Sequence, residues 1–140
     1  MKLRVFLDTN VFIYSFEFPG SNSAKIIDML NDYKIEAVIS EMVLKEVIFY
    51  FERKHSKELA KKFRKYLLDN CSLVFKEEVV EQIKELKGKI KDKDIEQLAS
   101  AQKYGLKLIS YDRDFNDFEE YMTPKRFLGS LNLKFEDSEF

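Results

Sequence analysis

The chain has 140 residues, with 24 lysines and arginines, 25 aspartates and glutamates, and a formal net charge of −1. This length corresponds to one domain, which can bury about two-thirds of the surface of its unfolded chain. The balanced charge gives no basic field that would indicate a nucleic-acid partner, and no apolar stretch approaches the roughly 20 residues of a membrane span. The only cysteine, Cys71, excludes an internal disulfide and indicates a reducing, cytoplasmic location. We expect no signal peptide, because the first predicted strand begins almost at once.

The predicted elements alternate between short apolar strands and amphipathic helices. Val5, Phe6 and Leu7 form an apolar run that predicts a strand buried on both faces. A buried helix follows over residues 11–16, and the breaker pair Pro19-Gly20 ends it. Apolar side chains at helical spacing, often preceded by serine caps such as Ser23 and Ser40, predict the later helices. The further predicted helices cover residues 24–33, 41–54, 57–70, 77–87, 92–105 and 115–120, and the further strands cover residues 37–40, 72–75 and 106–110.

Two interpretations remain open near the C-terminus, where residues 121–131 predict either an edge strand or a helical turn around Pro124. The last residues, 134–140, contain Glu136, Asp137 and Glu139 and are expected to fray as an acidic tail. Strands that alternate with helices predict a parallel sheet between two layers of helices, because parallel strands need crossover connections. We therefore predict a single α/β domain over residues 1–131, with an acidic tail over residues 132–140.

Four acidic residues stand out because of where they lie relative to the predicted strands. Asp8 directly follows the first strand, and Asp112 follows the fourth by two residues. Glu46 lies within the first two turns of the helix after the second strand, and Asp94 opens a later helix. In a parallel sheet these positions share the edge at which α/β sheets bind ligands. Asp8 by itself could equally well cap the next helix, but together the four predict one acidic site.

Carboxylates gathered at one edge repel each other, and a divalent cation removes that conflict. Oxygen ligands without histidine or cysteine suit Mg²⁺ or Mn²⁺ and not zinc. A water activated by such an ion can attack a phosphodiester, and the ion supplies the positive charge that the chain lacks overall. Nearby polar side chains with expected auxiliary roles in orienting ligands are Thr9, Asn10, Ser110 and Asp114.

The same residues carry a resemblance to a known family. Leu7-Asp-Thr-Asn-Val11 resembles the opening motif of PIN domains, the metal-dependent ribonucleases that include VapC-type toxins. The similarity continues in chain order over nearly the whole sequence. The further matching segments are Ser40–Glu46, Asp94–Ala101 with the following Gly105, Leu108–Phe115 and Thr123–Leu128.

The resemblance implies a three-layer α/β/α fold with a central parallel sheet of about five strands, and metal ligands at Asp8, Glu46, Asp94 and Asp112. It also implies cleavage of single-stranded RNA by a metal-activated water, usually by homodimers, and raises the question of a cognate antitoxin protein. The sequence departs from the family pattern at three places. Ser110 stands where threonine is more usual, Asp92 competes with Asp94, and the basic helix over residues 57–70 is less typical.

Several features have simpler interpretations. The segment Arg53–Lys65 carries seven basic residues and one acidic residue, which suits an RNA track, but a solvated helix face is favoured. His55, the only histidine, is better explained as a residue between two helices than as a general base. Tyr14, Phe16 and Phe18 are expected in the core and not as base-stacking platforms. The alternative function is a catalytically silent RNA-binding or scaffold module of the same fold, and a phosphate-accepting receiver domain is disfavoured.

Overall fold

The computed structural model describes residues 2–140 and contains one parallel sheet of five strands. The order across the sheet is β3-β2-β1-β4-β5, and every neighbouring pair is parallel. The predicted α/β fold is therefore confirmed, and the uncertain C-terminal segment supplies both a strand and a helix. The strands are β1 (Leu3–Leu7), β2 (Ile35–Ser40), β3 (Cys71–Val74), β4 (Lys107–Ile109) and β5 (Tyr121–Met122).

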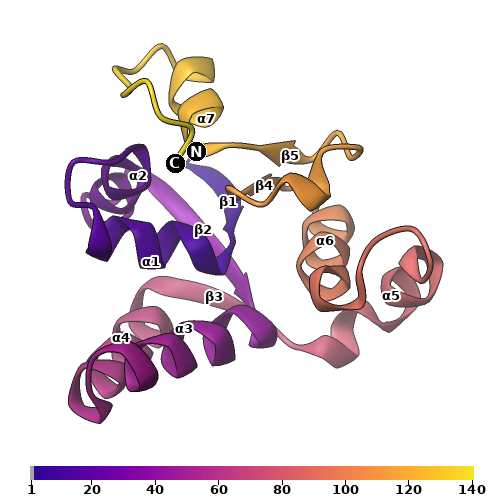
Figure 1. Cartoon of the computed structure of the whole chain (residues 1–140). Helices are drawn as coiled ribbons and strands as arrows, with labels where there is room; N and C mark the ends of the chain where they lie inside the picture. Colours follow the sequence, from indigo (N-terminus) through magenta and orange to yellow (C-terminus); the bar gives the residue numbers. More distant parts are fainter. Residues whose placement is uncertain (1) are drawn as a thin grey trace.

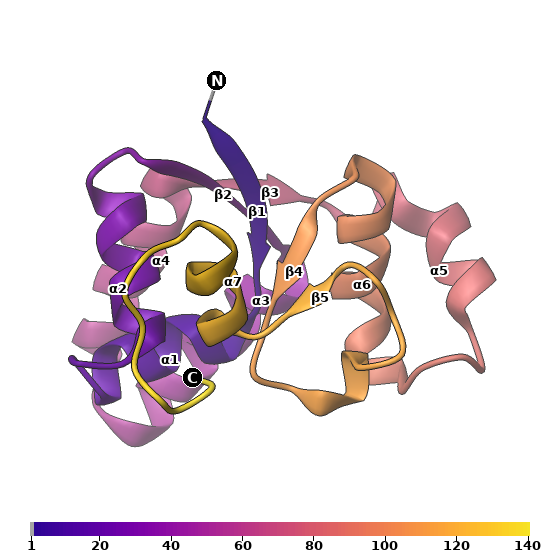
Figure 2. The ribbon, with the colours of Figure 1, turned by 90° about the horizontal axis from the view of Figure 1, so that it is seen from above.

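Helices cover both faces of this sheet. Figures 1 and 2 show α1 and α2 on one side and α5 and α6 on the other, which makes three layers. Within residues 2–140 no helix has both the length and the apolar character needed to cross a bilayer. The helices are α1 (Thr9–Glu17), α2 (Asn22–Asn31), α3 (Glu41–Lys54), α4 (Lys57–Asn70), α5 (Val80–Leu86), α6 (Asp92–Tyr104) and α7 (Pro124–Ser130), with short 3-10 turns η1 (Lys76–Val79) and η2 (Arg113–Phe115).

The strand order creates a switch point between β1 and β4. The chain first builds outward from β1 to β2 and β3, and then returns to the other side of β1 for β4 and β5. Where the direction of winding reverses, the connections leave the carboxyl ends of adjacent strands on opposite faces, and a crevice opens between them. The backbone N–H of Asp8 donates to the carbonyl oxygen of Ile109 at 3.0 Å, so Asp8 lies directly at this crevice.

Local signals account for most helix boundaries. Helices α3 and α4 occupy the predicted ranges, and Ser40 caps α3 by accepting a hydrogen bond from the backbone N–H of Val43. Gly105 ends α6 with a φ of 64°, a left-handed conformation that favours glycine. Two predictions were wrong. Ser21, and not Ser23, caps α2, and the short helix expected at residues 115–120 is instead the turn η2.

The histidine and one of the aromatic residues serve the packing of α1 against α3 and α4. His55 follows the last residue of α3, and its Nε2 lies 3.1 Å from Oε1 of Glu17. The ring of Phe16 packs edge-on against Phe51 and Phe63, whose own rings stack 3.9 Å apart. These contacts agree with the structural interpretation of His55. The expectation that Phe16 and Phe18 lie in the core is wrong, because they are 40% and 49% exposed and pack at the surface.

The C-terminal tail is docked, so the expectation that it frays is wrong. The Nδ2 of Asn22 donates to the carbonyl oxygen of Ser138 at 2.6 Å, and the backbone N–H and Oγ of Ser23 both donate to an oxygen of Phe140 at 2.8 Å. The ring of Phe140 packs 4.8 Å from that of Tyr14. These interactions offset the entropy lost when the tail is ordered. Figure 2 shows the tail passing α7 and α2 and ending between α1 and the loop after β4.

Candidate active site

Asp8 is both a helix cap and a member of an acidic site. It is the N-cap of α1, and its Oδ1 accepts a hydrogen bond from the backbone N–H of Thr9 at 2.8 Å. Its Oδ2 accepts from Oγ of Ser110, also at 2.8 Å. Burial raises the pKa of Asp8 to about 6, and the negative charges of Glu46 and Asp112 act in the same direction. The two interpretations that the sequence left open are therefore compatible.

Glu46 reaches the same edge from α3. Its Oε1 accepts a hydrogen bond from Oγ1 of Thr9 at 2.8 Å, which ties α3 to the first turn of α1. Burial raises the pKa of Glu46, and the charges of Asp94 and Glu96 raise it further. A glutamate side chain leans towards the N-terminus of its helix, so a residue in the second turn can reach the strand ends. Thr9 thus bonds to both acids, to Asp8 through its backbone N–H and to Glu46 through its hydroxyl.

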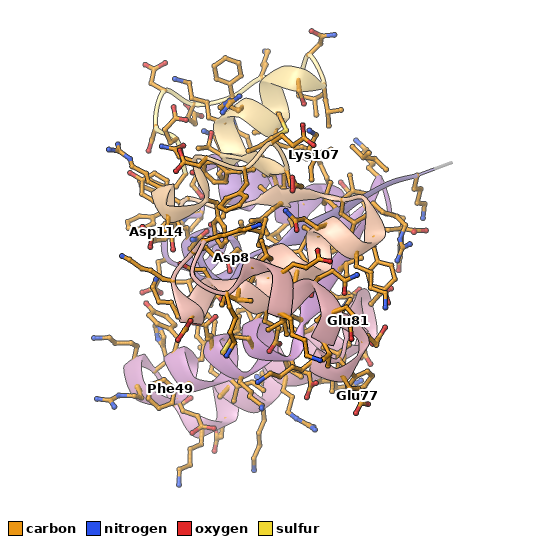
Figure 3. All side chains as sticks on the ribbon, turned by 90° about the vertical axis from the view of Figure 1, so that its right-hand side faces the viewer. Asp8, Phe49, Glu77, Glu81, Lys107 and Asp114 are labelled. Atoms are coloured by element: carbon orange, nitrogen blue, oxygen red, sulfur yellow. The ribbon has the colours of Figure 1, made fainter. Side chains whose placement is uncertain are left out.

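Three further aspartates meet at the start of α6 and in the loop after β4. Carboxylate oxygens of Asp94, Asp112 and Asp114 all lie within 4.8 Å of one another. The pKa of Asp94 is raised to about 6. Burial is the largest cause, and the negative charges of Asp112, Asp8 and Asp114 also raise it. Asp92, the competing acid, is exposed, whereas Asp94 is buried. Figure 3 shows the labelled Asp8 and Asp114 on one part of the molecule and the unrelated acids Glu77 and Glu81 on another.

The hydroxyl of Ser110 links the strand ends. It accepts hydrogen bonds from Nδ2 of Asn10 at 3.1 Å and from the backbone N–H of Asp112 at 3.0 Å, and it donates its proton to Asp8. The Oδ1 of Asn10 in turn accepts from the backbone N–H of Tyr111 at 3.0 Å. All hydrogen-bonding capacity of the Ser110 hydroxyl is used, so the direction of its O–H bond is fixed towards Asp8. Each predicted auxiliary residue therefore contacts an acid or orients a residue that does.

Sequence reasoning missed Lys93. Its Nζ lies 3.6 Å from Oδ1 of Asp94, 3.4 Å from Oδ2 of Asp112 and 3.9 Å from Oδ2 of Asp114. A lysine between two aspartates at the start of a helix resembles any solvated surface residue. The only available signal was its position beside Asp94 on the helix that opens at the acidic edge. The ammonium group shows that the cluster attracts positive charge.

Glu96 is a second residue that the sequence did not single out. It is buried on α6, and its Oε2 accepts a hydrogen bond from the backbone N–H of Met42 at 2.9 Å. Met42 belongs to the first turn of α3, where backbone N–H groups lack partners within the helix. Glu96 therefore holds α3 and α6 together on either side of the acids, as a positioning residue.

The arrangement fits a divalent cation. Oδ2 of Asp94 is buried and accepts no hydrogen bond within the described residues, which is unfavourable for a carboxylate oxygen unless a ligand satisfies it. The surrounding donors are carboxylate oxygens and hydroxyls, the ligand types that Mg²⁺ and Mn²⁺ prefer. Asp94, Asp112 and Asp114 each offer a carboxylate oxygen within 4.8 Å of the others and could hold such an ion. Asp8 and Glu46 add negative charge nearby, since Asp8 raises the pKa of Asp94 and Asp94 raises that of Glu46.

Replacement of Ser110 by alanine is expected to raise the pKa of Asp8 above about 6 and to lower the stability of the protein by about 1 to 3 kcal/mol at neutral pH. The buried carboxylate loses its hydroxyl donor, and the loss is smaller in acid because Asp8 is then protonated. Carboxyl resonances followed by NMR during a pH titration, together with urea unfolding, measure both effects. Ser110→Thr keeps the hydroxyl and should behave like the parent protein. An unchanged Asp8 titration in the alanine variant would refute this role.

Replacement of Lys93 by glutamine is expected to tighten Mg²⁺ or Mn²⁺ binding several-fold, because the ammonium group competes with the cation for the same carboxylates. Calorimetric titration of the protein with each metal measures the change. Lys87→Gln provides a matched control, since Lys87 is exposed and lies outside the acidic cluster. Weaker metal binding by the Lys93 variant would show that the ammonium group supports the ion instead of opposing it.

Solved structures of toxin–antitoxin proteins share this fold. A chain from a Klebsiella pneumoniae toxin–antitoxin complex superposes with a TM-score of 0.67 at 22% identity, over 86% of this chain and 97% of that chain. VapBC2 of Rickettsia felis, solved with a DNA fragment from its promoter, gives 0.63 at 17% identity, over 85% and 96%. VapC20 of Mycobacterium tuberculosis, described as a sarcin-ricin loop cleaving toxin, gives 0.62 at 18% identity, over 82% and 95%. At these identities the likeness shows the fold alone.

Sequence comparison gives a family. An uncharacterized protein of Methanocaldococcus jannaschii is 39% identical over 67 residues, which make up 48% of this chain but only 39% of that relative. The sequence model of the PIN domain matches residues 5–121. That range contains all five strands except the first two residues of β1 and the last residue of β5, and it contains every acid of the candidate site. Since the match extends over most of the sequence, the chain belongs to the PIN domain family.

Proposed function

We propose that this protein is a divalent-cation-dependent endoribonuclease that cleaves single-stranded RNA. The observation that carries the proposal is the set of mutually repelling, partly buried acids at the switch point of the sheet, with one buried carboxylate oxygen of Asp94 left without a partner. Perturbed carboxyl groups in a crevice are typical of catalytic sites. Membership of the PIN domain family supports the same activity. The catalytic unit is proposed to span residues 1–131, with residues 132–140 as an appended acidic tail.

Asp8, Glu46, Asp94 and Asp112 are proposed to bind Mg²⁺ or Mn²⁺. When bound, such a cation supplies a Lewis acid that activates water and stabilises negative charge on a phosphate. The protein prepares the site through fixed hydrogen bonds. Ser110 and the backbone N–H of Thr9 hold the two oxygens of Asp8, and the Thr9 hydroxyl holds Glu46. We expect direct hydrolysis by water, without a covalent enzyme intermediate.

An assay of the purified protein against several single-stranded RNAs tests the proposal. Cleavage is expected with Mg²⁺ or Mn²⁺ and is expected to stop when a chelator is added. Fragments that form equally well in chelator would contradict the metal dependence. If no RNA is cut and calorimetry detects no Mg²⁺ binding, the protein is instead a silent RNA-binding or scaffold module.

We also propose that the protein acts as a homodimer and as the toxin of a toxin–antitoxin pair. Support comes from the similarity of its fold to chains solved in toxin–antitoxin complexes. Lys93, which already lies among the acids, supports a mechanism in which a basic side chain from an antitoxin neutralises the site. Co-expression with the product of a neighbouring small open reading frame should suppress cleavage. A crystal structure of that complex in which the acidic edge stays uncovered would contradict the inhibitory mechanism, and a monomeric mass by light scattering would contradict the dimer.

A further inference from the structure

A second pocket lies beside the acidic site. It has a volume of about 230 Å³ and is lined by residues from the loop after β4, from β5 and from the start of α7, with Glu139 of the tail on one side. Tyr111 and Arg113 of this pocket are the sequence neighbours of Asp112 on either side. The pocket therefore begins where the acidic cluster ends. Its remaining lining residues are Asn116, Tyr121, Thr123 and Arg126.

The pocket is equipped to bind an anion. Arg113 and Arg126 both line it, and neither forms an ion pair with a carboxylate among residues 2–140. Guanidinium groups bind phosphates with paired, charge-assisted hydrogen bonds. The amide of Asn116 adds a further hydrogen-bond donor to the wall. The pocket thus combines positive charge and donors next to a site dominated by acids.

Tyr121 gives an independent indication that the pocket can take a hydrogen-bond acceptor. Its side chain is 5% exposed, and its hydroxyl is buried without a hydrogen-bond partner in the described part of the chain. An unsatisfied buried polar group costs about 1 to 3 kcal/mol. Burial raises the pKa of the Tyr121 phenol, so it remains a protonated donor at neutral pH. A phosphate oxygen in the pocket would accept the hydrogen bond that the protein itself does not provide.

The C-terminal tail places its own anion against this pocket. Oε1 of Glu139 accepts a hydrogen bond from Oγ1 of Thr123 at 2.8 Å, and Oε2 lies 3.6 Å from Nζ of Lys125. The next residue, Phe140, is held by ring contacts with Tyr111 at 5.3 Å. A carboxylate therefore already sits on the wall of the pocket, at a place where an incoming phosphate would meet repulsion.

We propose that this pocket is a phosphate subsite for the RNA strand, next to the scissile bond, and that Glu139 competes with RNA for it. The proposal rests on the proposed nuclease function, because it assigns the pocket to that substrate. Arg113 and Arg126 hold the phosphate, and Tyr121 donates its hydroxyl proton as a hydrogen bond. The subsite positions the strand so that the adjacent phosphodiester reaches the acids. It also gives a chain with no overall positive charge a local means of binding RNA.

RNA binding measured without cleavage tests the subsite. The probe is a fluorescein-labelled oligouridylate in calcium buffer, because Ca²⁺ screens the acids but does not impose the octahedral geometry of Mg²⁺. Arg113→Gln and Arg126→Gln should each weaken binding about tenfold or more. Each should also reduce the slope of log affinity against log salt concentration by about 0.7, the value for one phosphate contact on a single strand. Arg4→Gln is the matched control, since Arg4 lies near the start of β1, at the end of the strand away from Asp8, and pairs with Glu36.

Two further variants separate ligand binding from a structural role. Tyr121→Phe should weaken RNA binding and yet raise the thermal stability of the free protein, because it removes the unpaired hydroxyl. Glu139→Gln should tighten RNA binding, because it removes the competing charge. If Arg113→Gln weakens binding, equal affinity for oligomers with a 5′-phosphate and a 5′-hydroxyl would assign the pocket to an internal phosphodiester. A preference for the 5′-phosphate that disappears in Arg113→Gln would assign it to a terminal phosphate, and either result supports the subsite.

The outcomes distinguish the subsite from the nuclease function. If both arginine variants bind RNA like the parent and keep its salt dependence while the parent still cuts RNA, the subsite is refuted and the nuclease function stands. If the arginine variants lose binding but the parent does not cut any RNA, the subsite stands and the nuclease function fails. A parent protein that binds no RNA would overturn both.

Discussion

Replacement of Asp8 by asparagine is expected to reduce cation-dependent RNA cleavage by more than about 100-fold. Mutation of a residue that only orients a metal ligand often lowers metal affinity or activity by about 10- to 100-fold, and loss of a ligand should cost more. Asp8 lies at the switch point of the sheet, with both carboxylate oxygens held by hydrogen bonds from Thr9 and Ser110. An amide keeps the size of the side chain but removes the negative charge that the cation needs. Cleavage rates of a single-stranded RNA at saturating Mg²⁺ measure the loss.

The same variant should fold at least as stably as the parent at neutral pH. Burial raises the pKa of Asp8 to about 6, so its charged form is unfavourable in the folded protein when no cation is bound. Asp117→Asn is the matched control, because it makes the same chemical change at a residue that is exposed in the loop before β5. Retained cleavage by the Asp8 variant would contradict the assignment, and an unfolded variant would be detected by circular dichroism.

The second large effect is expected in the pH dependence of stability. The pKa values of Asp8 and Asp94 are each raised from 3.8 to about 6 in the folded protein, so both groups bind protons more readily when the chain is folded. The stability that the two groups contribute to the folded protein is therefore fully present below about pH 3.8. It is lost as the pH rises to about 6 and stays lost above that. In the presence of a chelator, ionisation of these two groups should lower the melting temperature as the pH rises over this interval.

Mg²⁺ or Mn²⁺ should restore the stability only where the carboxylates are ionised. At a concentration of 100 times the dissociation constant, a cation stabilises the folded state by about 2.7 kcal/mol. Differential scanning calorimetry at about pH 8 should show this increase, and at about pH 4.5 the increase should be absent because protons occupy the ligands. An equal increase at both pH values, or none at either, would contradict a carboxylate metal site.

Two neighbouring aspartates on α6 give a matched pair for this experiment. Asp94→Asn should raise the melting temperature in chelator at about pH 8 and should reduce the response to Mg²⁺, since it removes a buried charge. Asp92→Asn should do neither, because Asp92 is exposed. If the two variants exchanged these behaviours, the choice of Asp94 over Asp92 made from the sequence would be wrong.

Helix boundaries set by local chemistry were predictable from the sequence. The ranges of α3 and α4 agree with their apolar spacing and with serine caps at Ser40 and Ser56, whose side chains bond to backbone within three residues. The acidic edge was predictable for a related reason. Strand ends of a parallel sheet meet at one edge, so residues that follow strands, such as Asp8 and Asp112, could be placed together once the strands were recognised.

Interactions between distant parts of the chain were not predictable in this way. The docking of the tail depends on Asn22 and Ser23 bonding to residues more than 100 positions away, and the sequence alone suggested a mobile acidic end. The cap of α2 was misplaced for the same reason, because Ser23 points to the C-terminus while Ser21 caps the helix.

The sequence by itself therefore determined the alternation of strands and helices and the parallel sheet, and it predicted which acids lie at the ends of the strands, since each of these follows from periodicity, capping or strand ends over a few residues. Only the tertiary structure decided that Lys93 lies among the acids, that Oδ2 of Asp94 and the hydroxyl of Tyr121 are buried without partners, and that Glu139 lies against the second pocket. The physical reason is that burial, hydrogen-bond satisfaction and the electrostatic shift of a pKa depend on neighbours in space. These neighbours come from separate helices and strands, and no local pattern in the chain records them.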